Sequence, residues 1–146
     1  MTNSGSFQTR RSENFDKTYK ALVKGHYRKN SRGREDFEKQ LAGFVALLRS
    51  DPRLPPPFGG LEPWPKGTYR EGWELRKLHF DPPELRGASG EGRLIYMIDT
   101  ERSVVYLIWI YTHQEFPTRP PDKSLRQVVE EARQEAEEVE RDPEGE

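Results

Sequence analysis

The segment from Trp73 to His113 reads WELRKLHFDPPELRGASGEGRLIYMIDTERSVVYLIWIYTH, and it contains three runs with the composition of β-strands. These runs cover residues 73–80, 92–99 and 104–113. A loop with proline and glycine joins the first two, and a short turn joins the last two. The third run is almost entirely apolar and rich in β-branched and aromatic residues, which predicts a central strand covered on both faces.

The first strand is predicted to present basic side chains on both of its faces. Successive strand side chains point to opposite sides of a sheet. Lys77 and His79 therefore share one face, whereas Arg76 and Phe80 share the other.

Two helices are predicted before the sheet and one after it. Residues 14–29 and 34–49 carry apolar side chains at helical spacing, and the turn-like residues 30–33 join them as a hairpin. After the sheet, residues 117–121 end the strand pattern, and Asp122 can cap a last helix. This order predicts an α+β fold with an N-terminal helical hairpin, a three- to four-stranded antiparallel sheet and a C-terminal helix.

The length of 146 residues fits one domain with tails. We predict a disordered tail over residues 1–12, a single α+β domain over residues 13–141 and an acidic tail over residues 142–146. Residues 52–72 hold six prolines and four glycines. Because proline fixes φ and lacks an N–H donor, this linker is predicted to cross the surface outside the sheet. Phe58, Leu61 and Trp64 are candidates to anchor it to the core.

Several chemistries find no support in the composition. The chain has no cysteine, which excludes a disulfide framework, a thiolate nucleophile and sulfur ligands for a metal. Its three histidines are scattered, and its glycine-rich stretches lack the lysine pattern of a phosphate-binding loop. We therefore expect no metal site and no small-molecule cofactor.

No stretch predicts contact with a membrane. Residues 1–11 lack the apolar core of a secretory signal, and no apolar run reaches membrane-spanning length. We expect a soluble cytoplasmic protein without a membrane partner.

The formal charge of −1 conceals an asymmetry along the chain. Residues 120–146 hold four Lys/Arg and ten Asp/Glu, whereas the other 119 residues hold 20 Lys/Arg and 15 Asp/Glu. A basic body with an acidic tail fits an anionic partner such as RNA. For the tail itself, a solvated acidic helix is an equally good interpretation.

Several of these features together resemble the RelE/ParE superfamily of bacterial toxins. They are the order of elements, ELRK at residues 74–77, GEGRLIY at residues 90–96, Ile98–Asp99 at the exit of a hairpin, and His113 at the end of the last strand. The resemblance covers residues 36–129. It implies a RelE-like mRNA interferase, which cleaves messenger RNA in the ribosome, or a ParE-like protein that targets DNA gyrase. Either kind is held inactive by a cognate antitoxin encoded beside it.

The chemistry of RNA cleavage gives a separate reason to consider an endoribonuclease. Without a metal ion, the reaction needs a base for the ribose 2′-hydroxyl, cations for the charge on phosphorus and an acid for the leaving 5′-oxygen. Histidine and arginine suit these tasks. The resemblance places Arg93 at the scissile phosphate and His113 in cleavage. Lys77 joins them as a catalytic candidate, with Arg76 and His79 as RNA-binding neighbours.

Tyr111 and Tyr96 are further RNA-binding candidates, through stacking on bases. The tyrosine that the family carries near its C-terminus has no counterpart here, since Phe116, Pro117 and Arg119 occupy that region.

Each assignment has a structural alternative. Arg93 can form an ion pair with Glu74 or Glu91 across the sheet. Lys77 and Arg76 can be solvated strand residues, and His79 can be a hydrogen-bonded packing residue. Two hypotheses follow: an RNA-cleaving toxin, and a non-catalytic interaction module that binds gyrase or another protein.

Overall fold

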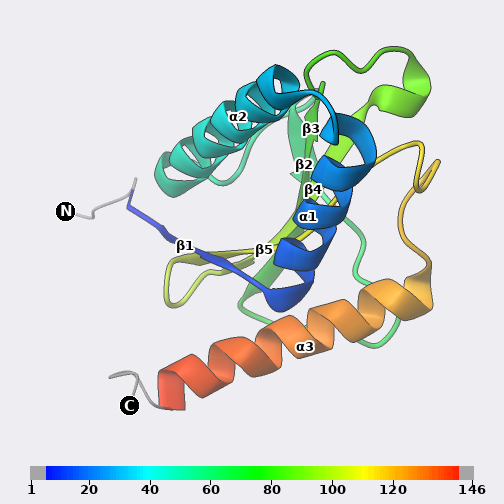
Figure 1. The fold of residues 1–146 in the computed structure, drawn as a ribbon. Helices are drawn as coiled ribbons and strands as arrows, with labels where there is room; N and C mark the ends of the chain where they lie inside the picture. The colour runs from blue at the N-terminus through cyan, green and yellow to red at the C-terminus, as the bar shows by residue number, and fades with distance from the viewer. Residues whose placement is uncertain (1–5, 142–146) are drawn as a thin grey trace.

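The computed structural model describes residues 6–141, in which three α-helices and a five-stranded sheet form an α+β fold (Figure 1). The elements follow the order β1 (Gln8–Arg11), α1 (Glu13–Tyr27), α2 (Ser31–Ser50), β2 (Gly59–Leu61), β3 (Trp73–Phe80), β4 (Gly92–Asp99), β5 (Val104–Thr112) and α3 (Asp122–Arg141), with a short 3₁₀ helix at Ala88–Gly90. Within this range no helix has the length and apolar character needed to cross a membrane.

The sheet is mixed and larger than predicted. Its strand order is β1-β5-β4-β3-β2, with antiparallel pairing throughout except between β1 and β5, which are parallel. β5 is an interior strand with both faces buried, as predicted. The prediction of a purely antiparallel sheet of three or four strands is wrong, because two short strands without apolar alternation join its edges.

Both extra strands come from segments predicted to lie outside the sheet. β1 falls in the expected disordered tail, and its residues pair with β5 from Val104 to Leu107. β2 falls in the proline-rich linker and pairs with β3 only, at the sheet edge. Prolines flank β2 but do not interrupt it, so its N–H donors remain intact. The predicted acidic tail, residues 142–146, lies outside the described residues, as do residues 1–5.

The helical hairpin forms, but its turn is shorter than predicted. Ser12 caps α1 by accepting a hydrogen bond from the Phe15 N–H at 3.0 Å. Asn30 caps α2 in the same way, accepting from the Gly33 N–H at 2.9 Å, so α2 begins at Ser31 rather than at residue 34. Gly33 is therefore a helical residue, and a Cβ there would lie 2.9 Å from the Tyr27 ring.

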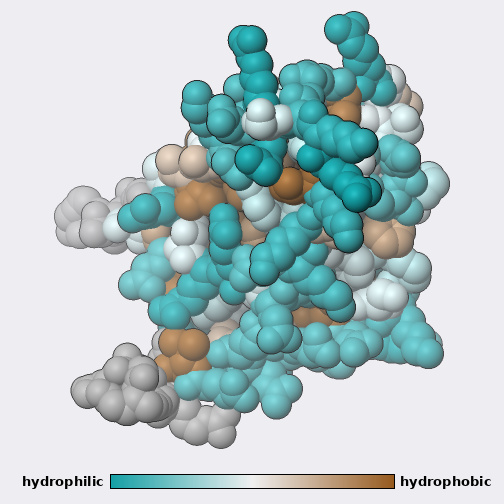
Figure 2. All heavy atoms as spheres, in the orientation of Figure 1, coloured by the Kyte–Doolittle hydropathy of each residue, from teal (hydrophilic) through white to brown (hydrophobic). Residues whose placement is uncertain are grey.

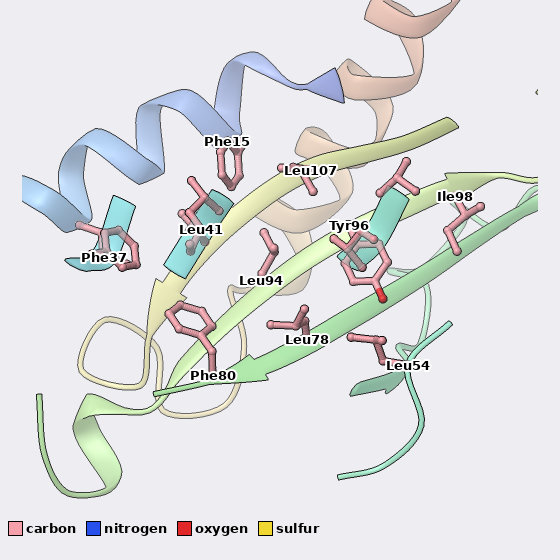
Figure 3. Packing of buried hydrophobic residues seen from close by; sticks show 14 of the residues in the cluster. Phe15, Phe37, Leu41, Leu54, Leu78, Phe80, Leu94, Tyr96, Ile98 and Leu107 are labelled. Atoms are coloured by element: carbon pink, nitrogen blue, oxygen red, sulfur yellow. The ribbon is translucent and has the colours of Figure 1, made fainter. Parts of the chain in front are cut away.

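One face of the sheet is sealed by α1 and α2 (Figure 3). The Phe37 ring is fully buried and stacks on the rings of Tyr19, Tyr27 and Phe80. Strand residues that alternate with the basic positions contribute to this core; they include Leu78, Leu94, Tyr96, Ile98, Val105 and Leu107. We call this side of the sheet the sealed face.

α3 packs on the opposite face of the sheet (Figure 1) and meets the hairpin at the start of α1, where the Glu13 N–H donates to Glu135 Oε1 at 3.3 Å. Its apolar side chains Leu125, Val128, Val129, Ala132 and Ala136 contact the second core cluster. Arg133 of α3 is buried with its guanidinium 5.3 Å from the Trp64 ring and 5.9 Å from the Trp73 ring. Since Trp73 begins β3, this covering lies toward the start of that strand and leaves its other end for charged residues.

Candidate functional site

Most of the residues predicted to act on RNA lie on the sheet face that α3 partly covers, at the end away from Trp73. Strand register places His79 opposite Arg93, and Arg93 opposite Tyr111, in one row across β3, β4 and β5. Lys77 precedes His79 by two residues and shares its face. His113 follows β5 and joins this end through its backbone N–H, which donates to the Glu91 carbonyl at 2.9 Å. We call this region the open end.

A surface cavity of about 260 Å³ lies at the open end. Its lining residues are Pro57, Phe58, His79, Phe80, Asp81, Glu91 and Arg93. Phe58 was expected to anchor the linker in the core, but its side chain is 64% exposed at this cavity, and Leu61 is also exposed. Trp64, the third predicted anchor, does pack against the core beside α3, and Leu54 also anchors the linker on the sealed face.

The path of β4 near the site depends on a glycine. A Cβ at Gly92 would lie 2.4 Å from the Phe80 ring, so the ring occupies the space that any side chain would need. This close approach explains one glycine of the GEGR sequence. Because Gly92 has no side chain, the Phe80 ring can lie against β4 at the position next to Arg93.

One carboxylate joins Arg93 and His113. The Glu91 Oε1 atom lies 3.3 Å from Arg93 Nη2 and 3.7 Å from His113 Nδ1. Arg93 also donates to the Gly92 carbonyl at 2.8 Å. Glu74 and Glu91 were the two predicted partners of Arg93, and the structure shows the ion pair with Glu91. The Glu91 side chain is partly exposed, so it can move aside when an anionic ligand approaches Arg93.

A second carboxylate holds Lys77. The Glu62 side chain is only 5% exposed and lies 3.0 Å from both Lys77 Nζ and Arg119 Nη1. Arg119 also donates to the Pro63 carbonyl at 2.7 Å. Removing one member of such a buried pair leaves an uncompensated charge, which is costly. Lys77 is therefore part of a fixed ion-pair network beside the cavity and is not among the residues that line it.

The environment of His79 favours its neutral form. Burial is the largest cause of a lowered pKa for this imidazole, followed by the charges of Arg93 and Lys77. A neutral imidazole at pH 7 can accept a proton or a hydrogen bond.

Tyr111 is buried within the site region rather than displayed on its surface. Burial raises its pKa to about 12, and its hydroxyl donates to the Thr118 carbonyl at 3.2 Å. The ring packs edge-on against Phe116, with 5.5 Å between centroids. In this arrangement the hydroxyl keeps its proton, and the ring supports the strand.

Two predicted site residues lie on the opposite face of the sheet. Tyr96 is fully buried in the sealed core, where its hydroxyl donates to the Pro52 carbonyl at 2.6 Å. Arg76 Nε donates to Glu74 Oε1 at 2.7 Å on that same side. The structure therefore does not bring Arg76 and Tyr96 to the open end, and base stacking by Tyr96 would require its removal from the core.

Three residues of this region were missed by sequence reasoning: Glu62 and Arg119, which form the network around Lys77, and Phe58, which lies at the cavity. The carboxylate and its arginine are separated by 57 positions, so no local pattern could pair them. An aromatic residue in a proline-rich loop was a signal for Phe58, but it did not distinguish a core anchor from an exposed ring.

Comparisons with known proteins found no family model, no curated protein and no solved structure that matches this chain. Within residues 6–141, no group of three or more His, Asp or Glu side chains is arranged to hold a metal ion. The open end is therefore interpreted from its own geometry: one imidazole, one guanidinium, two carboxylates and an exposed phenyl ring line a small cavity, and the His113 imidazole lies behind Glu91.

Proposed function

We propose that the protein is a toxin-like endoribonuclease of the RelE/ParE kind, which cleaves messenger RNA in the ribosome and is inhibited by a cognate antitoxin. The observation that carries the proposal is the shared face of Lys77, His79 and Arg93, with His79 and Arg93 lining one open cavity and His113 held beside Arg93 through Glu91. Action on ribosomes implies a cytoplasmic protein.

In the proposed reaction, side chains supply the acid and the base without a metal ion. The ribose 2′-oxygen loses its proton to an imidazole and attacks the adjacent phosphorus, while the 5′-oxygen leaves with a proton from a second group. The products are a 2′,3′-cyclic phosphate and a 5′-hydroxyl. Glu91 contacts His113 at Nδ1, so Nε2 of that ring remains available for proton transfer. His79, whose neutral form is favoured, is the second candidate for the imidazole that takes the proton of the 2′-hydroxyl.

Arg93 has the role of stabilising charge on the phosphate. Its planar fork matches two phosphate oxygens once the Glu91 carboxylate moves aside. Lys77 contributes positive potential from its position beside Glu62. Phe58 offers a stacking surface for a base next to the cleaved bond.

The test is primer extension on messenger RNA in a cell-free translation reaction supplied with purified protein. The unmutated protein should create new 5′ ends, and mass spectrometry should find cyclic phosphate on the upstream fragments. Arg93→Ala should reduce cleavage by about 10²-fold or more, and His113→Ala should also reduce it. Arg76→Ala is the matched control on the opposite face and should cleave normally. Messenger RNA left intact by the unmutated protein would contradict the proposal.

A non-catalytic interaction module is the second candidate. It is favoured by the carboxylate partner of each predicted catalytic cation and by the net charge of −1, which is low for an RNA-binding toxin. This alternative predicts intact RNA together with binding to gyrase or another protein. A supercoiling assay with purified gyrase separates the two, because only a gyrase-binding protein would slow that reaction.

The antitoxin part of the proposal is tested with the gene beside this one. Co-expression should give a stable complex, and the neighbouring protein should suppress cleavage. A neighbour that neither binds nor suppresses would remove this part.

A further inference from the structure

The outer side of α1 carries a stripe of positive charge. Residues 17–34 contain seven Lys/Arg and no Asp/Glu. Four of these cations, Lys17, Lys20, Lys24 and Arg28, follow one another at intervals of three and four, which places them on one side of the helix. At 1.5 Å per residue the stripe is about 16 Å long. We call these four residues the α1 stripe.

The cations of the α1 stripe have no neutralising partners. All four are exposed, and within residues 6–141 none of their side chains makes an ion pair or hydrogen bond. α2 differs, since its exposed side mixes both signs and Arg34 pairs with Glu38 at 4.0 Å. Figure 2 shows the hydrophilic character of the surface over both helices.

α1 runs along the edge of the sheet that leads to the open end. β1 pairs with β5 only as far as Leu107, so the rest of this β5 edge lacks a neighbouring strand. Two side chains of α1 bind the backbone of this edge instead. Asn14 donates to the Ile108 carbonyl at 2.9 Å, and Thr18 accepts from the Ile110 N–H at 3.2 Å. The helix therefore follows β5 toward His113.

A groove lies between α1 and the last residues of β5. It has a volume of about 250 Å³, and its lining is mainly apolar: Ala21 and Leu22 on the helix side, Trp109, Ile110 and Tyr111 on the strand side, and Phe116 beside the Glu115 carboxylate. Ala21 lies between Lys17 and Lys24 on the helix surface. Tyr111 is the register partner of Arg93. The α1 stripe thus lies on one side of this groove, and Tyr111, the neighbour of Arg93 in the sheet, lies on the other.

We propose that the α1 stripe binds the phosphate backbone of RNA outside the cleaved phosphodiester, so that a strand in the cavity continues across the β5 edge onto α1. This inference rests on the proposed function and deepens it. Lysine binds phosphate as a point charge, so the contact is independent of sequence and strongly salt-dependent. Four exposed cations at helical spacing, with no Asp or Glu in residues 17–34, match the repeated charge of a phosphate backbone, and an acidic peptide is the competing ligand in the test below.

The experiment measures binding of fluorescent RNA with 2′-O-methyl riboses, which cannot be cleaved by attack of the 2′-oxygen. Oligonucleotides of four and of 20 nucleotides are titrated at several salt concentrations. The test variant replaces the four stripe residues by glutamine. The control variant replaces four exposed cations elsewhere, Lys39, Arg49, Arg86 and Lys123, by glutamine, so that both have the same net charge. Circular dichroism verifies that each variant is folded.

For the 20-nucleotide RNA, the stripe variant should reduce the slope of log affinity against log salt by about 0.7 for each lost phosphate contact, or roughly 3 for four contacts. At 0.1 M salt this corresponds to a loss of roughly 10²- to 10³-fold in affinity. The four-nucleotide RNA, which fills the cavity alone, should bind equally to all three proteins, and the control variant should keep most of the affinity for the long RNA.

Three results would overturn the inference. They are an unchanged salt slope in the stripe variant, an equal loss in the control variant, and tighter binding of an acidic helical peptide than of RNA to the stripe. Because the RNA is uncleavable, stripe-dependent binding without cleavage of messenger RNA would reject the proposed function alone. Cleavage that the stripe variant retains on long RNA at full affinity would reject the inference alone.

Discussion

The two faces of the sheet differ in how completely they are covered, although the same three strands form both. On the sealed face, α1 and α2 bury alternate residues such as Leu78 and Leu94. On the other face, α3 covers the part near Trp73 and leaves His79 and Arg93 beside an open cavity. Charged side chains can thus be displayed on a rigid scaffold, because the same backbone is fixed by the core behind it.

The acidic part of α3 lies away from the open end. The Arg133 side chain packs near the start of β3, and Glu137 pairs with Arg70 at 3.0 Å. Only the beginning of α3 approaches the site, where Asp122 pairs with Arg119 at 3.0 Å. The acidic side chains from Glu130 to Glu138 are not among the residues that line the cavity.

The largest expected difference between the faces concerns two phenylalanines. Phe37→Ala should reduce the free energy of unfolding by about 3–5 kcal/mol, because it empties a fully buried stacking site. Phe58→Ala should change it by less than about 0.5 kcal/mol, since this ring is exposed. Urea denaturation measures both values. Phe58→Ala should instead weaken RNA binding by about 1–3 kcal/mol, and equal stability losses in the two variants would contradict the comparison.

Glu62, the carboxylate that pairs with Lys77, should affect both the stability of the protein and RNA cleavage. Glu62→Gln should lower the free energy of unfolding by about 1–3 kcal/mol, a value reduced from that of a fully buried pair because Lys77 and Arg119 are partly exposed. It should also lower cleavage through displacement of Lys77. Glu71→Gln, an exposed residue of the same linker, is the control, and a Glu62→Gln protein as stable as this control would show that the network contributes nothing.

Gly92, which packs against the Phe80 ring, should not tolerate a side chain. Gly92→Ala should destabilise the protein by about 1–3 kcal/mol, because its Cβ would collide with the Phe80 ring. Gly43→Ala in α2 meets no atom within 4 Å and should be stabilising by about 0.5–1 kcal/mol. Thermal denaturation of both variants measures the contrast. A stable Gly92→Ala protein with an unshifted Phe80 would contradict the proposed packing.

The smallest expected effect is the pH dependence that His79 gives to stability. Its pKa is lowered in the folded protein by burial and by Arg93 and Lys77, whereas the unfolded chain has the ordinary value of about 6.5. The unfolded state therefore binds the proton more readily. The resulting stabilisation is present above about pH 6.5 and is lost as the pH falls through the lowered folded pKa.

NMR titration of the histidine rings tests this prediction directly. His79 should titrate below about 6.5, and His79→Gln should weaken the loss of stability in acid. Titration of His79 above that value would contradict the environment described for the open end.

The alternation of β3 was predictable from sequence, because a period of two assigns Lys77 and His79 to the face opposite Phe80 without knowledge of any partner strand. Arg93 was named through the family resemblance, and its place on this face follows from its register opposite His79. Alternation could not locate Glu62 or Arg119, whose contacts depend on how the linker returns to the sheet edge. The pairing of residues 8–11 with β5 was missed for a related reason: a short polar strand acquires its conformation from the edge that it joins.

The face assignments of the two tyrosines show the same limit. Tyr96 and Tyr111 are both aromatic strand residues, and nothing in the local sequence shows that one fills the sealed core while the other packs against Phe116. A one-residue irregularity between β4 and β5 at Ile95/Tyr96 shifts the register between them. Such a bulge cannot be placed from alternation alone.

The most direct test of the open-end account is chemical-shift mapping by NMR with the uncleavable four-nucleotide RNA. We predict that saturating RNA shifts the signals of His79, Arg93 and His113 and the ring of Phe58, and leaves Phe37 and Leu41 on the sealed face unchanged. Perturbations confined to the outer surface of α2, or their absence from the open end at saturation, would contradict the claim that this end of the sheet binds a phosphodiester.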